Sequence, residues 1–378
     1  MVRVEGTATV ASSNRKKRPA RVFLAAVFVI IAYFTLFPYP LHKEIVAHPA
    51  WAVAVPDAAT PVAAAAAQPS APDLASVAPF QLGDSFGYVA KDGTVLSSGR
   101  TLFRVTLSQS GFVNYTRLGT DWLLQDPTGR RLTSFSGVGY PLLSPDGSRL
   151  FNVKTDLSGI MELDKNGGVL WDRDFPALIT SASISADSLL VGLLNGTLVL
   201  LNREGSPVFT RSLKGSRIGV VMGAAIAPNG SMIAGVSGID PQYLTVLRRR
   251  EAGFEQVAAR PLRSDFRREV RLAFSPDSRF LAFEDASGGG LFDPAGGAIS
   301  TVTLPGELAG LAFPAHGRCA AFLARSSEGN AELAIVAPFS APLYREEFPS
   351  ADVFLGSVDG QLLMGWNGRL LRIDIEEL

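Results

Sequence analysis

Side chains that commonly carry out catalysis or bind metals are scarce in this sequence of 378 residues. It contains one cysteine, Cys319, and three histidines, of which only His316 lies beyond residue 48. A zinc site needs clustered His, Cys or carboxylate ligands, and nucleophilic catalysis needs a serine or cysteine beside a base. No Gly-x-Ser-x-Gly motif is present. We therefore predict no metal, no cofactor and no catalytic residues, with His316 in a turn and Cys319 in a buried strand.

Most of the aspartates occupy positions that predict a structural role. They lie in short turn motifs between apolar runs, such as "SPDG" at 144–147 and "LDKNGG" at 163–168. In such turns the carboxylate accepts hydrogen bonds from backbone amides a few residues ahead. The aspartates for which we expect this role are Asp146, Asp164, Asp277, Asp293 and Asp359.

Arginine is concentrated in one segment, 248–271, which reads "RRREAGFEQVAARPLRSDFRREVR" and holds eight arginines against four acidic residues. The guanidinium group binds carboxylates and phosphates through paired hydrogen bonds, so this segment is a candidate surface for a protein partner. The alternative is a solvated strand and loop whose charges pair with one another. The partner-binding residues that we predict are Arg248, Arg249, Arg250, Arg263, Arg267 and Arg268.

The composition indicates a folded protein with a membrane segment. Apolar residues make up 47% of the chain and charged residues 19%, and the formal net charge is zero. Residues 1–21 hold six basic residues and one acidic residue, a balance of +5, so residues 22–378 carry −5. Because a protein that binds nucleic acid needs a basic surface, we predict no nucleic-acid partner.

One long apolar segment, 22–41, follows the basic residues of the N-terminus. A helix of this length spans about 30 Å, which is the thickness of the hydrocarbon core. The basic residues predict that the N-terminus stays inside and that the following chain is exported. A cleaved signal peptide is the alternative, but the first small-x-small motifs lie more than ten residues beyond Phe37. The predicted anchor residues are Val22, Phe23, Leu24, Val27, Phe28, Val29, Ile30, Ile31, Tyr33, Phe34, Leu36 and Phe37.

We divide the chain into a basic cytoplasmic tail at 1–21, a signal-anchor helix at 22–41, a linker at 42–79 and a folded domain at 80–378. The linker is rich in alanine and proline, a composition typical of extended connections. We therefore expect a single-pass protein of the inner (cytoplasmic) membrane. Its folded domain should lie in the periplasm or another extracytoplasmic space.

The folded domain repeats one short pattern at intervals of about 40–50 residues. Alternating apolar residues predict strands, and Asp-Gly or Asn-Gly pairs predict tight hairpins. After most of these turns comes a second phrase, as in "GIMELDKNGGVLW" at 159–171 and "GTLVLLNREGSPVF" at 196–209. The recurring turn motifs are "AKDG" (90–93), "SPDG" (144–147), "SADS" (185–188), "APNG" (227–230), "SPDS" (275–278), "PAHG" (314–317) and "SVDG" (357–360).

Each repeat thus holds about four short strands, and one four-stranded sheet cannot bury both of its own faces. Stacking the sheets in a closed ring buries them and leaves no long free edge. In these motifs the chain resembles the β-propeller superfamily of WD40-like and pyrroloquinoline-quinone (PQQ)-like repeats. "SPDG" resembles the hairpin of WD40 blades, and "LDKNGGVLW" resembles the Asp-x-x-Gly-x-x-x-Trp phrase of quinoprotein repeats. No repeat carries the full Gly-His…Trp-Asp set of WD40 blades.

The resemblance implies an all-β fold, a single β-propeller of about seven four-stranded blades within a range of six to eight. A β-sandwich would give turns every 8–12 residues without the longer period. We expect a partial blade at the C-terminus to pair with a strand near 80–90 and close the ring. The predicted blades lie near 84–135, 139–175, 178–213, 218–262, 270–304 and 308–348, with the partial blade at 351–376.

Rigid blades that hold variable loops suit protein binding. We therefore expect a non-catalytic scaffold or envelope assembly factor that binds another envelope protein. A ligand- or carbohydrate-sensing module is one alternative, and it predicts aromatic and polar residues gathered at the mouth of the central channel. A hydrolase or lyase is another, and it predicts carboxylates at strand ends on the channel rim. A quinone-dependent dehydrogenase is disfavoured, because those enzymes are much longer.

Overall fold

The computed structural model describes residues 27–28, 45–56, 76–117, 119–251, 253–314, 317–338, 342–350 and 352–377. Contacts divide the chain into one unit at Val46–Glu376 and a second made of residues 1–45 and 377–378. The first unit consists of strands joined by short turns and connections.

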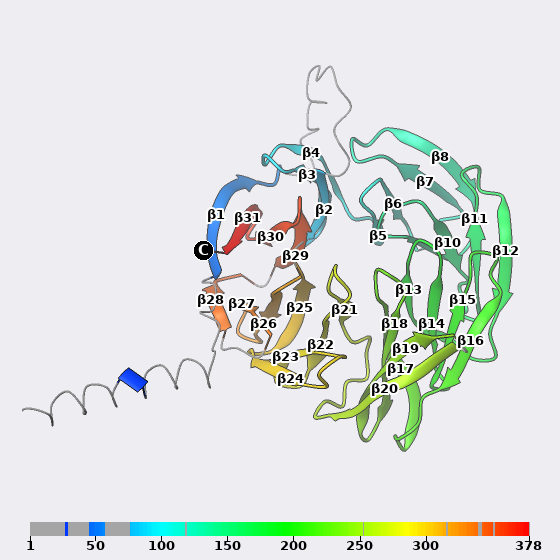
Figure 1. The fold of residues 1–378 in the computed structure, drawn as a ribbon. Coiled ribbons are helices and arrows are strands. Elements are labelled where there is room, and N and C mark those ends of the chain that lie inside the picture. The colour runs from blue at the N-terminus through cyan, green and yellow to red at the C-terminus, as the bar shows by residue number, and fades with distance from the viewer. Residues whose placement is uncertain are drawn as a thin grey trace, which may run out of the picture. The chain divides into compact units, whose positions relative to one another are not determined.

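The described strands form eight antiparallel sheets that follow one another around a ring (Figure 1). Seven of these sheets have four strands and one has three. We number them as blades from the one that begins at Val77. Blade 1 holds β2 (Val77–Leu82), β3 (Ser85–Ala90) and β4 (Val95–Arg100); blade 2 holds β5 (Arg104–Leu107), β6 (Phe112–Tyr115), β7 (Asp121–Gln125) and β8 (Arg131–Ser136); blade 3 holds β9 (Tyr140–Leu143), β10 (Leu150–Val153), β11 (Gly159–Leu163) and β12 (Val169–Asp174); blade 4 holds β13 (Ile179–Ile184), β14 (Leu189–Leu193), β15 (Thr197–Leu201) and β16 (Pro207–Ser212).

The second half of the ring repeats the same order. Blade 5 holds β17 (Ile218–Ile226), β18 (Met232–Ile239), β19 (Gln242–Arg250) and β20 (Gly253–Leu262); blade 6 holds β21 (Leu272–Phe274), β22 (Leu281–Asp285), β23 (Gly288–Phe292) and β24 (Ile299–Thr303); blade 7 holds β25 (Glu307–Ala312), β26 (Ala320–Arg325), β27 (Ala331–Val336) and β28 (Pro342–Phe348); blade 8 holds β29 (Val353–Val358), β30 (Gln361–Trp366), β31 (Arg369–Glu377) and β1 (Ile45–Ala54).

Burial differs along each blade because its strands lie at different depths between their neighbours. The middle strands are covered on both faces, so β14 is buried at every position. The outermost strands are covered on one face. In β16, half-buried and exposed residues therefore alternate from Val208 onward. The core lies between blades: Leu190 and Leu198 of blade 4 form one cluster with Val221 and Ile233 of blade 5. The fold is an eight-bladed β-propeller.

Because neighbouring strands alternate in direction, the loops of each blade lie at two opposite ends of the ring. In the seven four-stranded blades the first and third turns lie at one end, which we call the turn end. The second turns and the connections between blades lie at the other, which we call the connection end. The motifs "SPDG", "SADS", "APNG", "SPDS" and "SVDG" are all first turns and share the turn end. Blade 1 has three strands and runs the other way: the amide of Thr101, just before β5, donates to the carbonyl of Asp84 in the first turn of blade 1 at 2.8 Å, which places that turn at the connection end. "AKDG" joins β3 to β4 as the second turn of blade 1, so it lies at the turn end but is not a first turn like the others.

A strand from the N-terminal side closes the ring. β1 lies beside β31 as the fourth strand of blade 8 (Figure 1). Trp51 donates from Nε1 to the carbonyl of Lys91 in blade 1 at 2.7 Å, and the amide of Val55 donates to the carbonyl of Gly368 in blade 8 at 2.8 Å. Our expectation that the C-terminal strands pair near residues 80–90 was wrong.

The same strand occupies part of the segment that we expected to be a linker, 42–79. Its sequence, IVAHPAWAVA, contains Pro49 and several alanines, which weaken a strand signal. Proline lacks a backbone donor, but β1 is the outermost strand of its blade, and an edge strand has no partner on one side. Position in the ring therefore permits a sequence that local propensity disfavours.

The blade number is eight, at the upper limit of the range we expected and one more than our count. The predicted first blade, 84–135, covers strands of two sheets: β3 and β4 of blade 1, and blade 2. The predicted partial blade, 351–376, becomes complete when β1 joins it. Blade 1 was missed because it has three strands, and its first turn, at Gly83, carries no motif of the "SPDG" type.

The predicted tail at 1–21 and signal-anchor helix at 22–41 lie outside the described residues, except for Val27 and Phe28. In the part of the chain that the structure describes, no helix is long and apolar enough to cross a membrane. The anchor stays a prediction.

Candidate interaction site

The structure separates the six predicted partner-binding arginines into two groups. Residues 248–250 end β19 at the turn end, whereas residues 263–268 lie in the connection between blades 5 and 6 at the connection end. The ten residues of β20 run between them, a length of roughly 30 Å. The two groups therefore do not form one continuous surface.

The arginines at the turn end contact their own protein. Arg248 donates to the carbonyl of Pro294 in blade 6 at 3.0 Å, and Arg250 pairs with Glu255 on the next strand at 3.2 Å. Arg249 lies over an aromatic ring of β20, 5.7 Å from its centroid. These contacts match the alternative that we gave for this segment, a strand and turn with internal pairing.

Two arginines at the connection end are held differently. Arg263 and Arg267 are exposed, and neither forms an ion pair within the described chain. The connection that carries them is held to β19: Ser264 donates to the side chain of Gln242 at 2.8 Å, and Gln242 donates to the carbonyl of Phe266 at 2.6 Å. The backbone of this connection is thus held in place, and the two arginine side chains on it are available to bind an acidic group.

Arg268 belongs to the wall of the central channel. Its guanidinium group donates to both oxygens of the buried Glu284 at 2.6 and 3.0 Å, and its Nε lies 3.1 Å from Glu307. A charge-assisted pair with two parallel hydrogen bonds is among the strongest polar contacts in proteins. Arg268 is therefore occupied within the protein.

A cavity of about 590 Å³ opens at the connection end of the channel, between the innermost strands of blades 4 to 7. Glu269 faces it, and Ser181 of β13 donates to the Glu269 carboxylate at 3.3 Å. Burial raises the pKa of Glu269, against the opposing effects of the Ser181 hydrogen bond and the distant charges of Arg271 and Arg104. Solvent reaches this side chain through the mouth.

Large apolar side chains are exposed at the same end of the ring. They come from three successive connections, one second turn and the first residue of β17, and the backbones around Leu178, Leu194 and Ile218 adjoin. Leu194 donates its amide to the carbonyl of Leu178 at 2.8 Å, and a Cβ on Gly196 would lie 3.2 Å from the Cα of Gly219. We call these residues the apolar arc: Leu102 (65% exposed), Phe103 (40%), Val138 (62%), Leu178 (42%), Leu194 (48%) and Ile218 (45%).

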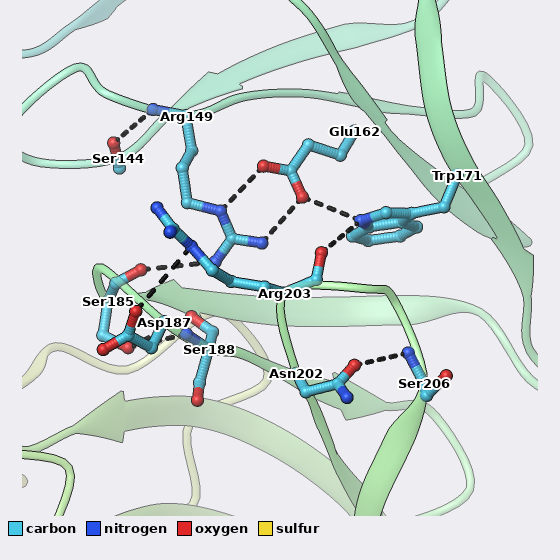
Figure 2. A network of polar contacts seen from close by, with 10 residues as sticks. All are labelled: Ser144, Arg149, Glu162, Trp171, Ser185, Asp187, Ser188, Asn202, Arg203 and Ser206. Carbon is cyan, nitrogen blue, oxygen red and sulfur yellow. Dashed lines mark hydrogen bonds and ion pairs between the residues drawn. The ribbon is translucent and has the colours of Figure 1, made fainter.

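A groove of about 1090 Å³ lies at the turn end, mainly between blades 2 and 3. Its floor holds the network in Figure 2, where the Arg149 guanidinium group points at Glu162 and donates to both carboxylate oxygens at 2.8 and 2.7 Å. Trp171 donates to the same carboxylate at 2.8 Å, and Arg149 also reaches the carbonyl of Ser185 in blade 4 at 3.4 Å. The pair is buried and satisfied within blade 3, and the contacts that cross to blade 4 are those of Arg149 with the Ser185 carbonyl and of Trp171 with the Arg203 carbonyl at 3.0 Å.

The remaining residues singled out from the sequence are a cysteine, a histidine and the turn aspartates. Cys319 is fully buried, as expected, and His316 lies outside the described residues. Asp359 adopts a left-handed backbone conformation with φ 49°. The other four predicted turn aspartates accept a backbone amide from two residues ahead at 2.7–3.0 Å: Asp146, Asp164, Asp277 and Asp293.

Comparison with known proteins agrees with this architecture. A sequence profile described as "beta-propeller protein" matches residues 13–378. This chain belongs to that β-propeller family. An uncharacterized protein of Treponema pallidum (strain Nichols) is 23% identical over 301 residues, which cover 79% of this chain and 78% of the relative. The fold is similar to that of BamB from Moraxella catarrhalis, with a TM-score of 0.58 over 87% of this chain and 100% of that one, at 15% identity. At such low identity the likeness shows the fold alone.

Sequence reasoning missed the apolar arc of this propeller. Its members are dispersed in sequence between residues 102 and 218, at the ends of strands and in short connections, so no single apolar segment marks them. Val138, between Gly137 and Gly139, shows the available signal, which is a large apolar residue inside a turn-like sequence. Only the ring brings such residues to one end.

The chemistry available at the channel mouth is limited. Glu284 and Glu307 share Arg268, so Glu269 is the carboxylate there that no arginine holds among the described residues. Within the described ranges no group of three or more His, Cys, Asp or Glu residues is placed to hold a metal ion. The arrangement suits binding of a polar group better than bond cleavage by paired carboxylates.

Proposed function

We propose that this propeller is a non-catalytic scaffold that binds another protein through the apolar arc. The observation that carries the proposal is continuity: Leu178 and Leu194 are joined by a backbone hydrogen bond, and Ile218 adjoins them where Gly196 packs on Gly219. Single exposed apolar residues are normal on a soluble protein, but adjoining ones mark interaction sites.

The charge beside the arc indicates the chemistry of the partner. Along the ring, the connection after Ile218 is the one that carries Arg263 and Arg267, which are exposed and unpaired within the described chain. A partner that fits this end would present an apolar ridge followed by an acidic group. Apolar contact would supply affinity, and the acidic group would fix the orientation.

The arc is built in advance of binding. Its connections have three to five residues, at 101–103, 137–139, 175–178 and 213–217, and each joins two strands of the rigid ring. Short connections of this kind lose little conformational entropy on association, so more of the contact energy remains as affinity. This property suits a scaffold.

Two features favour a scaffold over our two alternatives. A hydrolase of the expected type needs two free carboxylates on the rim, and Arg268 holds both Glu284 and Glu307. A carbohydrate-sensing channel would bring aromatic platforms to its mouth, and the side chains that line the 590 Å³ cavity are serine, aliphatic and charged residues.

The proposal includes the membrane anchor at 22–41 and an extracytoplasmic place for the propeller, with another envelope protein as the partner. These parts come from the sequence, namely the apolar segment and the basic residues before it. A test of topology is modification of single cysteines introduced at Leu178 and at Val2 in intact cells, in a Cys319→Ser background. The proposal predicts that a membrane-impermeant reagent labels only the first.

Site-specific photo-crosslinking tests the docking surface. A photoreactive amino acid placed at Val138, Leu178 or Ile218 should trap one and the same protein in intact cells. Matched positions on the outermost strands, Val169 and Val208, are 59% and 51% exposed and should not trap it. The same protein trapped equally from both sets of positions would contradict the proposal.

A further inference from the structure

The charge of Glu269 at the channel mouth is satisfied only in part. Ser181 donates to it at 3.3 Å, which is long for a hydrogen bond, and no arginine or lysine of the described residues lies within 4.0 Å of its carboxylate. A carboxylate that is partly removed from water and lacks a counter-ion is stabilised when a cationic group binds beside it. The Glu269 side chain faces the 590 Å³ cavity, so that group can come from a ligand.

Arg271 offers the opposite charge to the same cavity. Its Nε donates to the carbonyl of Leu308 at 3.0 Å, which fixes the plane of the guanidinium group. Its two terminal nitrogens have no hydrogen-bond partner in the part of the chain that the structure describes. A carboxylate can accept two parallel hydrogen bonds from these nitrogens.

The other charges at the mouth are committed. Arg268 bonds both oxygens of Glu284 and also pairs with Glu307. Among the described residues that line the cavity, one available carboxylate and one available guanidinium group remain, each bonded to a different strand and held more than 4.0 Å apart. Arg104 lies outside this lining, where its guanidinium group stacks on the Phe103 ring. A lone anion or a lone cation would leave one of the two without a partner, whereas a zwitterion matches both.

We propose that this cavity binds a free α-amino acid with an aliphatic side chain, its ammonium group on Glu269 and its carboxylate on Arg271. The volume of about 590 Å³ lies within the range of small-molecule sites. The charged residues in the cavity lining are Arg268, Glu269, Arg271 and Glu307. The rest of the wall is small or aliphatic and consists mainly of Ala182, Ala224, Val270, Leu272, Ala273 and Leu311.

Acid should weaken this binding. The ammonium group needs the ionised form of Glu269, and burial makes that form harder to reach by raising the pKa of the carboxyl. Arg104 of β5 and Arg271 of the same connection both act on Glu269. Arg268 and Glu307, which pair with each other, line the same cavity as Glu269. The arginines stay charged at every pH at which the protein is folded. Affinity therefore falls as pH is lowered through the pKa of Glu269.

Isothermal titration of the purified full chain with L-leucine tests the proposal. Leucine should bind saturably, and N-acetyl-leucine and leucinamide should each bind at least about tenfold more weakly, because each lacks one of the two charged contacts. No saturable heat with leucine up to about 10 mM would overturn the proposal. Equal affinity for leucine and both analogues would overturn it as well.

Variants place the binding at these residues. Glu269→Gln keeps the shape of the side chain and should weaken leucine binding about 10- to 100-fold, and Arg271→Met should do the same. Glu328→Gln and Arg100→Gln, two exposed residues outside the channel, should leave the affinity unchanged. Unaltered leucine affinity in a Glu269→Gln chain with a native unfolding temperature would show that the site lies elsewhere.

Discussion

Arg149 and Glu162 show how the interior of this propeller accommodates charge. Both side chains are almost fully buried, and they share two hydrogen bonds (Figure 2). Taking two charges out of water costs several kcal/mol, and a pair of this geometry offsets that cost without a large surplus. The pair therefore contributes less net stability than orientation: it fixes the Arg149 side chain within blade 3, where Arg149 also reaches the Ser185 carbonyl of blade 4.

Breaking this pair should cost far more than replacing it. Arg149→Met leaves a buried carboxylate with only Trp171 to bond it and should lower the free energy of unfolding by about 3–5 kcal/mol. The double variant Arg149→Met/Glu162→Leu removes both charges and should lose much less. Urea unfolding of the three chains measures the difference. A double variant as unstable as the single one would contradict this account.

The turn aspartates should make part of the free energy of unfolding sensitive to acid. Burial tends to raise the pKa of Asp146, but hydrogen bonds from Ser144 and Ser148 outweigh it and hold the pKa below the usual 3.8. A depressed pKa means that the contribution is present above pH 3.8 and is lost as pH falls through the lower folded value. Thermal unfolding between pH 7 and pH 3 should show a shallower acid decline for Asp146→Asn. An identical pH profile would contradict the assignment.

At the scale of elements, the closure of the ring depends on a strand distant in sequence from its blade. β1 joins β31 and also contacts blade 1 through Trp51, so it touches both sides of the seam. A ring without this strand would leave β31 with a free edge, which invites pairing with other chains. β1 is therefore a stabilising clasp as well as the fourth strand of blade 8.

Truncating the clasp should loosen the seam before the rest of the ring. Trp51→Ala removes a half-buried ring and its hydrogen bond to Lys91, and should cost about 2 kcal/mol, roughly half the cost of a fully buried aromatic side chain. Hydrogen exchange should accelerate in β1 and β31 first. Val169→Ala, an exposed apolar truncation on another blade, is the matched control. Uniform acceleration around the ring would contradict a local clasp.

The elements that sequence predicted best are those with strong local chemistry. Hairpin turns such as "SPDG" (144–147) and "SPDS" (275–278) were predicted correctly, because their signals lie in adjacent residues. β1 escaped because its strand character comes from its place at an edge. The arginine segment was predicted as one surface, but β20 carries its two ends to opposite ends of the ring. The distance between two such groups depends on the direction of the strand that joins them, which local sequence does not encode.

At the scale of the whole molecule, the ring concentrates contacts that the sequence disperses. Residues between Leu102 and Ile218 come to one end only because blades 2 to 5 each begin at the connection end. The turn end is occupied by turns whose aspartates and serines bond their own backbone. The two ends therefore differ in what they offer to a partner, and the connection end has the unsatisfied apolar and basic groups.

The most direct test of the scaffold is the affinity of the crosslinked protein for two matched variants of the chain. Leu178→Ser/Leu194→Ser removes the centre of the apolar arc, and Val169→Ser/Leu170→Ser removes a pair on β12 that is still more exposed. If the arc is the docking surface, the first pair should weaken binding by about 30-fold or more, since central contacts commonly cost 2 kcal/mol or more on truncation, and the second should leave it unchanged. Equal affinity of both variants for the partner would contradict the proposed function.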